Sequence, residues 1–389
     1  MMRNSTHQFF APCPHGLEDV LADELVQLGA QAATTAEGGV RFSGDFPFCY
    51  KANLESRIAS RVLWQIASGG YRDEDDIYKV AYDLPWTDWF DVGRTLMVKV
   101  SAQKCPLKSL DFITLKIKDA ACDKFRKLVG YRPSIDTREP DVRIHAFLGA
   151  TRFILYLDTS GEALFKRGLR KTSVAAPLRE NLAAGILRLA GWMPGIPILD
   201  PMCGGGTFLL EAAQMALNIA PGIERNFAFE KLKNYDSRSW RTLRDTRRAQ
   251  QLAVEPLAIY GSDLHGDALE AARENLAAAG LADAVHLTQA DILEISAPAE
   301  RGIMVTNPPY GVRIGEQPEL AALYPMLGDL LKKRFAGWNA YIFTADMRLP
   351  KLIRLSVSRR IPLFNGALEC RLYELKMVAG GMKRTTKSS

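Results

Sequence analysis

The sequence predicts an α/β fold: an open, largely parallel sheet in the second half of the chain, preceded by an α+β region. Three observations support this expectation. Residues 302–306 are a short apolar run typical of a buried parallel strand. A second such run, residues 196–200, passes through a glycine-rich turn into a helical pattern. Strand and helix patterns then alternate through residues 257–344, as connections between parallel strands require.

The length and composition fit a globular protein of two or three domains. The chain has 389 residues, 47% of them hydrophobic, and a formal net charge of +6, which permits a nucleic-acid partner without requiring one. Its six cysteines form no C-x-x-C pair and there are only five histidines, so no metal site is expected. The start lacks the apolar core of a signal peptide and no run approaches a membrane span. We therefore expect a cytoplasmic protein.

The first 70 residues are expected to form a small unit of strands and helices. Residues 17–28 place leucines and a valine on one helical face, and a glycine pair at 38–39 leads into a strand. Apolar side chains at four-residue steps predict a second helix over residues 46–66. They are Leu54, Ile58, Val62 and Ile66.

Residues 71–171 are predicted to form a second α+β block. A strand at 96–100, a helix at 110–128 and a hairpin of residues 142–148 and 153–157 follow the apolar pattern. The side chains expected to face inward from this helix are Leu115, Ile117, Ala121 and Phe125.

Basic residues follow the same block and also fill an insertion at residues 221–255. Both sets fit either a solvated face or a surface that contacts a structured RNA, the insertion as a helical arm around Trp240. The first set is Lys116, Lys118, Lys124, Arg126, Lys127, Arg132, Lys166, Arg167, Arg170 and Lys171, and the second is Arg238, Arg241, Arg244, Arg247 and Arg248.

A domain boundary is expected near residue 171. Pro177 suits the first turn of a helix that runs to about residue 190, and a glycine-containing link then leads into the strand at 196–200. The expected domains are therefore 1–70, 71–171 and 172–389.

Asp200 ends that strand, and three consecutive glycines at 204–206 follow it before a helix over residues 208–220. Such glycines let the backbone pass close to a ligand and present the free N–H groups of the helix. The chain lacks the Gly-Lys-Ser/Thr signature of a P-loop. The Asp200 carboxylate would repel a pyrophosphate but pair with a cationic amino-acid group. This pattern favours S-adenosylmethionine over NAD.

The next two strands also end in acids. Asp263, at the end of residues 257–263, is placed to accept both ribose hydroxyls of an adenosine. Asp267, with a glutamate three residues on, is interpreted as a capping box for the following helix. Asp291, after the strand at 285–289, fits either an acceptor for the adenine amine or a turn former.

The strand at 302–306 delivers Asn307-Pro308-Pro309-Tyr310. An exocyclic amine on a nucleobase is a poor nucleophile until acceptors draw its hydrogens toward a tetrahedral arrangement. The Asn307 side-chain oxygen and the Pro308 carbonyl can do this by position rather than as bases. Tyr310 would stack on the target base. An ordinary proline-stiffened turn is the alternative.

These motifs carry a resemblance to a known family. The first 170 residues resemble the front half of THUMP-domain RNA methyltransferases, a ferredoxin-like piece followed by the RNA-binding THUMP module. The sequence Asp200-Pro-Met-Cys-Gly-Gly-Gly-Thr207, together with Asn-Pro-Pro-Tyr, resembles the amino-methylating branch of class I methyltransferases. The resemblance implies a Rossmann-like sheet of seven strands, the last antiparallel.

By position, the resemblance also places Glu180 at the methionine end of the cofactor and makes Cys203 a pocket residue rather than a nucleophile. A cysteine-dependent pyrimidine methylation would need Pro-Cys where this chain has Pro-Pro. The residues expected to bind S-adenosylmethionine are Glu180, Asp200, Cys203, Gly204, Gly206, Thr207, Asp263 and Asp291. Those expected to hold the target amine are Asn307, Pro308 and Tyr310.

The expected activity is methylation of N2 of a guanine in 23S rRNA, since the resemblance is closest to bacterial 23S rRNA guanine-N2-methyltransferases. Some relatives carry a second, fused methyltransferase, and a single activity is expected for this chain. A tRNA guanine-N2 or adenine-N6 methyltransferase is an alternative, because the tetrapeptide does not distinguish purines. A non-catalytic RNA-binding ribosome-assembly factor and a nicotinamide enzyme are alternatives of other classes.

Overall fold

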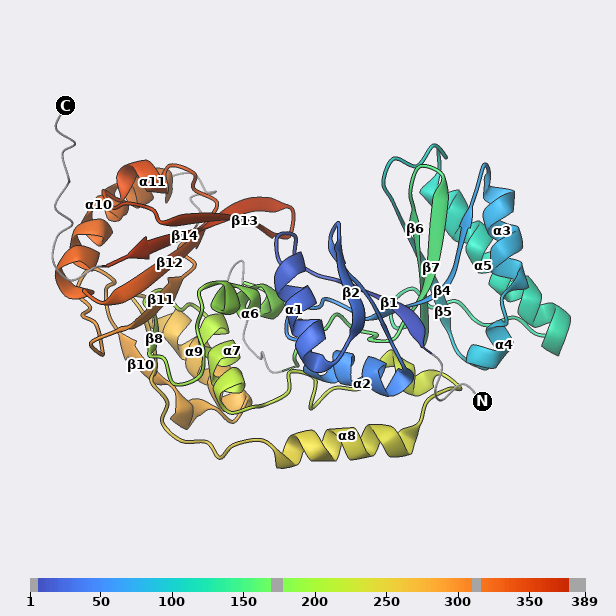
Figure 1. Ribbon diagram of the computed structural model, residues 1–389, viewed down its shortest axis with the longest axis horizontal. Helices are drawn as coiled ribbons and strands as arrows, with labels where there is room; N and C mark the ends of the chain where they lie inside the picture. Colours follow the sequence, from blue (N-terminus) through green and yellow to red (C-terminus); the bar gives the residue numbers. More distant parts are fainter. Residues whose placement is uncertain (1–5, 169–177, 310–315, 378–389) are drawn as a thin grey trace. The chain divides into compact units, whose positions relative to one another are not determined.

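The computed structural model describes residues 6–168, 178–309 and 316–377, except for the side chains of residues 316–320. This part of the chain forms two compact units, each built on a seven-stranded sheet (Figure 1). As far as they are described, the first unit comprises residues 6–13, 21–166 and 221–248, and the second comprises residues 14–20, 167–220 and 249–377.

The sheet of the first unit joins the two α+β blocks expected from the sequence. Its strand order is β2-β3-β1-β4-β7-β6-β5, and only β5 and β6 pair in parallel. Helices α3 and α5 pack together beside β4 and β5 (Figure 1). The strands are β1 (His7–Pro12), β2 (Gln31–Ala36), β3 (Gly39–Gly44), β4 (Leu63–Gly70), β5 (Leu96–Ala102), β6 (Val142–Leu148) and β7 (Arg152–Asp158), and the helices are α1 (Glu18–Leu28), α2 (Phe46–Glu55), α3 (Glu74–Asp83), α4 (Trp86–Trp89) and α5 (Leu110–Val129).

The helix predicted over residues 46–66 is wrong beyond residue 55. Helix α2 ends there, and the chain continues into strand β4. The buried Glu24 carboxylate accepts hydrogen bonds from the backbone N–H groups of Arg57 and Ile58, at 3.0 and 3.2 Å, and from the Ser56 hydroxyl at 2.6 Å. This contact from α1 satisfies backbone donors outside the helix, and the apolar spacing of the segment does not reveal it.

Helix α5 confirms the prediction for residues 110–128, with one exception among its inward residues. The Ser109 hydroxyl caps its start by accepting from the Phe112 N–H, and Gly130 ends it with φ of 82°. Ile117, Ala121 and Phe125 are buried as expected. Leu115 is 49% exposed, so its predicted inward orientation is wrong.

The insertion forms helix α8 (Ser237–Ala249), most of which belongs to the first unit. Trp240 is buried there, with its ring centroid 5.2 Å from that of Phe229 and 6.3 Å from that of Tyr50. The Tyr50 hydroxyl also accepts from the Asp236 N–H at 2.9 Å. The tryptophan is therefore a core residue of this unit rather than an exposed stacking group.

Four of the five arginines of α8 are engaged within the same unit, and one of them, Arg241, donates to the Ser237 carbonyl of its own helix at 3.3 Å. Arg247 lies 3.2 Å from the half-buried Glu55 carboxylate, and Arg248 lies 3.2 Å from Glu224. Arg244 donates to a backbone carbonyl at 3.0 Å. Most of the arginines expected to face RNA thus hold α8 in place through contacts within the protein.

The second unit contains the predicted Rossmann-like sheet. Its strand order is β10-β9-β8-β11-β12-β14-β13, and β14 alone runs against the others, which confirms the expected antiparallel last strand. The strands are β8 (Ile198–Asp200), β9 (Ile259–Asp263), β10 (His286–Gln289), β11 (Gly302–Thr306), β12 (Trp338–Thr344), β13 (Arg359–Asn365) and β14 (Leu368–Lys376), and the helices are α6 (Glu180–Leu189), α7 (Thr207–Ala216), α9 (Gly266–Ala278), α10 (Glu316–Arg334) and α11 (Leu349–Leu352).

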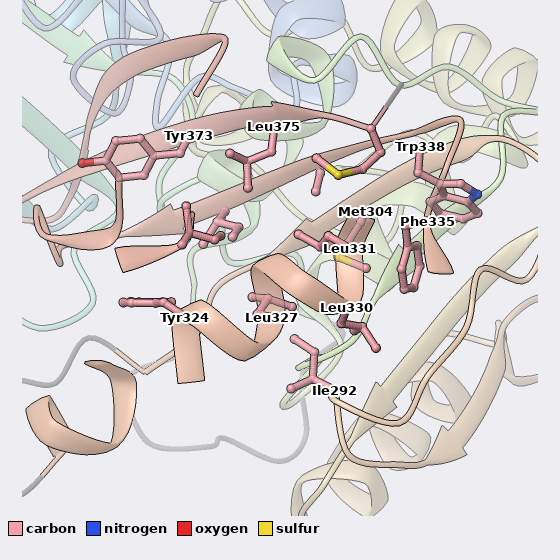
Figure 2. Close-up of a cluster of buried hydrophobic side chains, with 14 of the residues drawn as sticks. Ile292, Met304, Tyr324, Leu327, Leu330, Leu331, Phe335, Trp338, Tyr373 and Leu375 are labelled. Atoms are coloured by element: carbon pink, nitrogen blue, oxygen red, sulfur yellow. The ribbon is translucent and has the colours of Figure 1, made fainter. Parts of the chain in front are cut away.

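A buried apolar cluster fixes helix α10 against strands β11, β12 and β14 (Figure 2). Trp338 and Phe335 lie at one end of the cluster, and Tyr324 and Tyr373 lie at the other (Figure 2). Met304 of β11 is fully buried in it. Burial of side chains of this size stabilises the unit by roughly 1.5–3 kcal/mol each. The same packing fixes the position of β11 and therefore of the residues that follow it, beginning with Asn307.

Among the described residues, no helix is both long enough and apolar enough to cross a membrane, and no group of histidine, cysteine and acidic side chains suits a metal ion.

Candidate cofactor and active site

Four neighbouring strands of the second sheet place polar side chains at their carboxyl ends. Strands β10, β9, β8 and β11 lie side by side and run parallel. Asp263 is the last residue of β9, Asp200 is the last of β8, and Asn307 follows β11. Neighbouring strands are about 4.8 Å apart. The fold therefore brings these three predicted site residues together at the carboxyl end of the sheet.

The turn between β8 and α7 requires glycine. Gly204 and Gly206 have φ values of 50° and 78°, in the left-handed region that other residues rarely adopt. Gly206 is the N-cap of α7 and provides no side-chain cap, and Thr207, the first helical residue, is buried. A helix start of this kind offers backbone N–H groups to a ligand at the same end of the sheet.

Asp200 is a buried carboxylate. Its side chain accepts a hydrogen bond from the Met202 N–H at 3.2 Å. Burial raises the pKa of Asp200 to about 8, and the neighbouring Asp263 carboxylate adds to the rise. Two carboxylates at the ends of adjacent strands create a site that favours a cation.

Asp263 uses both carboxylate oxygens to shape the turn. Its Oδ2 accepts from the Gly204 N–H at 2.9 Å, and its Oδ1 accepts from the His265 N–H at 3.0 Å. A carboxylate has about four lone-pair sites, so two backbone bonds leave capacity for further donors such as ribose hydroxyls. Asp263 thus links the glycine turn to the start of α9.

The predicted capping box at Asp267 is wrong. Helix α9 begins at Gly266 with His265 as its N-cap, so Asp267 already lies in the first turn. Its carboxylate accepts from the next backbone N–H at 2.9 Å, and Glu270 pairs with Arg273 at 3.1 Å instead of reaching back. The helix starts early because Asp263 already binds the His265 N–H.

Cys203 and Asp291 have local structural contacts. Cys203 is buried, and its N–H donates to the Ser262 carbonyl at 2.9 Å. Burial, followed by the charges of Asp200 and Asp263, raises the pKa of its thiol, so the thiolate needed for a nucleophile is disfavoured. Asp291 accepts from the Leu293 N–H at 2.8 Å, which is the contact of a turn former. The adenine contact of Asp291 stays a prediction.

Asn307 is half-buried, and its Oδ1 has no hydrogen-bond partner in the described part of the chain. Pro308 is buried beside it. Buried polar atoms in folded proteins are nearly always paired, so an unpaired amide oxygen at the carboxyl end of a core strand indicates a position for a donor from a ligand. Tyr310, the third residue predicted for this site, lies outside the described residues.

Glu180 opens helix α6 and is partly exposed. Helices α6 and α7 pack against each other, so Glu180 belongs to the same unit as the glycine turn. Pro177, predicted for the first turn of this helix, lies outside the described residues. The contact of Glu180 with a cofactor stays a prediction.

Two features of this region were not anticipated. Ser262, next to Asp263 in β9, has a buried hydroxyl without a hydrogen-bond partner among the described residues. A single serine within a strand pattern does not reveal from the sequence that its hydroxyl will be buried without a partner. Arg167, expected on a basic surface, is instead buried and donates to the buried Glu211 carboxylate of α7 at 3.1 Å. Its neighbours in the sequence gave no sign of this burial.

Comparisons with known proteins agree with this architecture. Three family models match: the RlmL ferredoxin-like domain over residues 8–63, the THUMP domain over residues 71–158, and the RMKL-like methyltransferase domain over residues 167–374. A ribosomal RNA large subunit methyltransferase K/L from Photobacterium profundum is 38% identical over 384 residues, which cover 97% of this chain and 54% of the relative. The chain thus spans about half the length of this relative.

Other relatives match end to end. A putative RNA methyltransferase from Synechocystis, slr0064, is 37% identical over 95% of this chain and 97% of its own length. A solved structure of SMU.472, a putative methyltransferase complexed with SAH, has a TM-score of 0.88 at 29% identity and covers 97% of this chain and 100% of its own. The resemblance seen in the sequence is confirmed: the chain belongs to the family of RMKL-like methyltransferase domains, preceded by RlmL ferredoxin-like and THUMP domains.

Proposed function

We propose that this protein transfers a methyl group from S-adenosylmethionine to N2 of a guanine in structured RNA, with 23S rRNA as the substrate. The observation that carries the proposal is the unpaired Asn307 Oδ1, held just past β11 and beside the carboxylates at the ends of β8 and β9. The activity named for the K/L relatives supports the choice of large-subunit rRNA.

The residues at the carboxyl end of the sheet fit S-adenosylmethionine. Asp200 is a buried carboxylate near that of Asp263, and S-adenosylmethionine carries an ammonium group and a sulfonium, whose positive charge would favour the ionised form of Asp200. Asp263 retains acceptor capacity for ribose hydroxyls, and the glycine turn brings backbone close to the ligand. The residues proposed to hold it are Glu180, Asp200, Cys203, Gly204, Gly206, Thr207, Asp263 and Asp291.

When bound, S-adenosylmethionine supplies an electrophilic methyl group on its sulfonium. The chain's own contribution is to position the amine. Asn307 Oδ1 and the Pro308 carbonyl accept the two amine hydrogens, which returns lone-pair density to the nitrogen and points it toward the donor. Neither acceptor is a strong base, so the proton lost after transfer leaves to water. Tyr310 is proposed to stack on the flipped base.

The domain order supports an RNA substrate. We propose boundaries at 1–70, 71–171 and 172–389, and the three matching family models fall within or close to these ranges. The THUMP match includes helix α5, on which Lys116, Lys124 and Lys127 lie over the rings of Tyr78 and Tyr82 at 5.2–5.8 Å. Lysines held against aromatic faces suit contact with phosphates and bases.

The proposal is tested by incubating the purified protein with labelled S-adenosylmethionine and, separately, 23S rRNA transcripts, large-subunit precursors or total tRNA. Digested RNA is then analysed by mass spectrometry for methylated nucleosides. N2-methylguanosine in 23S rRNA is the expected product. N6-methyladenosine, or N2-methylguanosine confined to tRNA, would assign the alternative substrates. RNA binding without any transferred methyl would indicate an assembly factor.

A further inference from the structure

A strongly basic segment lies beside the proposed site in the second unit. Residues 346–376 contain seven lysines and arginines and three acidic residues, a net charge of +4 where the whole chain has +6. The segment includes α11, β13 and β14, which follow β12 in the sheet. A locally basic part of the second unit therefore follows the strand next to the one that delivers Asn307.

Strand register places three of these arginines near the carboxyl end of the sheet. Thr344, the last residue of β12, pairs with Arg371 of β14, and Arg360 of β13 pairs with Tyr373. Arg348 lies just after β12. Because β12 is the only strand between β11 and β14, Arg371 is about 10 Å across the sheet from the strand that ends at Asn307.

The side chains of Arg360 and Arg371 share the face of the sheet that carries Tyr373. Side chains two residues apart in a strand point to the same face of the sheet, so Arg371 and Tyr373 share a face. Arg360 pairs directly with Tyr373 on the neighbouring strand and therefore lies on this face too. The Tyr373 hydroxyl donates to the Met347 sulfur at 3.6 Å. Burial raises the pKa of Tyr373, while the nearby charges of Arg360 and Arg371 oppose the rise. Tyr373 and Tyr324 mark this end of the buried cluster in Figure 2.

Neighbouring acids hold the guanidinium groups of Arg348 and Arg371 in position. Arg348 donates from Nε and Nη2 to the two oxygens of Asp346, at 2.9 and 2.8 Å. Arg371 pairs with Glu369 at 2.6 Å and donates to the Cys370 carbonyl at 3.0 Å. These two contacts use two of the five N–H donors of the Arg371 guanidinium. The exposed Arg360 has no ion pair in the part of the chain that the structure describes.

Protection of an edge strand is the ordinary explanation for such charges. It accounts for Arg359 and Arg360, which lie with Pro362 on the outermost strand β13. It does not account for Arg371, which is on the inner strand β14, or for Arg348, which is on the loop after β12. Both lie toward the carboxyl end, where a target nucleotide must enter.

We propose that Arg348, Arg360 and Arg371 form a phosphate-binding cluster that holds the RNA backbone next to the target nucleotide. This inference rests on the proposed function and adds a second RNA contact, built into the methyltransferase domain itself. Two acids fix the planar guanidinium groups of Arg348 and Arg371, and all three positively charged residues lie toward the carboxyl end of the sheet. Such contacts position the RNA without reading its sequence.

The test compares Arg360→Gln and the double variant Arg360→Gln/Arg371→Gln with the wild-type protein on 23S rRNA. We expect the double variant to raise KM for RNA about tenfold with kcat nearly unchanged, and to lower the slope of log affinity against log salt by about 1–2. SAH affinity should stay within error, because neither side chain belongs to the residues proposed to hold the cofactor, and the melting temperature is measured in parallel to show that the variants are folded.

Matched controls are Arg301→Gln, an exposed arginine just before the amino end of β11, and Lys376→Gln, at the opposite end of β14 from Arg371. Both remove one positive charge from the same unit and should change KM less than twofold. An unchanged KM and salt slope in the double variant, or an equal effect of the controls, would overturn the proposal.

Fluorescence anisotropy with labelled rRNA fragments separates this proposal from the proposed function. If the wild-type protein transfers no methyl group to any RNA, the proposed function fails, while a selective loss of RNA affinity in the double variant still supports the cluster. If transfer is normal and binding is unaffected by both substitutions, the cluster fails and the proposed function stands.

Discussion

Asp200 and Asp263, the last residues of the neighbouring parallel strands β8 and β9, lie close enough for the charge of Asp263 to raise the pKa of Asp200. Burial makes the larger contribution and brings this pKa to about 8. The carboxylate of Asp263 itself accepts hydrogen bonds from two backbone N–H groups, which stabilise its negative charge. At neutral pH, the Asp200 carboxylate therefore becomes fully ionised only when a cation binds beside it.

Binding of S-adenosylmethionine or SAH should release a proton near neutral pH. With a pKa of about 8, only about a tenth of Asp200 is ionised at pH 7, and the ammonium group of either ligand favours the ionised form. Calorimetric titrations in phosphate and in Tris, whose ionisation enthalpies differ, should give about 0.9 proton released at pH 7 and much less at pH 9. In Asp200→Asn the release should vanish and affinity should fall at least tenfold, so an unchanged proton count in the variant would refute the assignment.

The same carboxylate predicts a pH dependence of stability for the ligand-free protein. The pKa of Asp200 is about 8 in the folded protein, whereas the ordinary value of 3.8 applies to the unfolded chain. The folded state therefore binds this proton more tightly than the unfolded state. Its contribution to the free energy of unfolding therefore decreases as the pH rises from about 4 to about 8. Asp200→Asn should raise the melting temperature by roughly 5 °C at pH 8.5 and by less at pH 5. If the difference in melting temperature between the two proteins were the same at every pH in this range, the prediction would be contradicted.

Removal of the buried Arg167 guanidinium should strongly destabilise the second unit. Arg167 and Glu211 are both buried and 3.1 Å apart, and Arg167→Met removes a buried positive partner of the Glu211 carboxylate. Urea denaturation should show a loss of about 3–5 kcal/mol in the free energy of unfolding. The control is Arg273→Met, which breaks the exposed pair with Glu270 at the same distance and should cost less than about 1 kcal/mol. Equal losses in the two variants would show that burial of the Arg167 pair is not decisive.

Cys203 should be dispensable for the chemistry. Its buried thiol has a raised pKa and lies beside two carboxylates, so it is a poor nucleophile. Cys203→Ala should keep kcat within about threefold of the wild-type value. Mass spectrometry after brief iodoacetamide treatment should find Cys105, which is partly exposed, labelled well before Cys203. A loss of transfer by several orders of magnitude in Cys203→Ala would instead indicate a covalent mechanism.

The sequence predicted the elements of the second unit well because local patterns determine them. The apolar runs ending at Asp200, Asp263 and Thr306 are short buried strands, and Gly204 and Gly206 supply the left-handed backbone conformations of the turn. The carboxyl ends of parallel strands meet at one end of a sheet, so the proximity of Asp200, Asp263 and Asn307 could be predicted from the strand order.

Long-range contacts explain what the sequence did not reveal. The carboxylate of Glu24 binds the backbone after α2 from another helix, and it ends that helix where the apolar spacing predicted continuation. Arg167 is buried because Glu211 of α7 lies opposite it. Trp240 packs on Tyr50, which lies 190 residues earlier in the sequence. Each outcome depends on a partner distant in the sequence, and local periodicity has no information about such partners.

The most direct test of the central claim measures methyl transfer to 23S rRNA by the wild-type protein, Asn307→Ala and Asn307→Asp, with SAH affinity measured in parallel. Asn307 Oδ1 is proposed to hold the target amine, so Asn307→Ala should lower kcat by about 10²–10³ and leave SAH affinity unchanged. Asn307→Asp keeps an acceptor oxygen and should retain more activity than the alanine variant. We expect N2-methylguanosine from the wild-type protein and this selective loss of kcat, and full activity in Asn307→Ala would contradict the role proposed for Asn307.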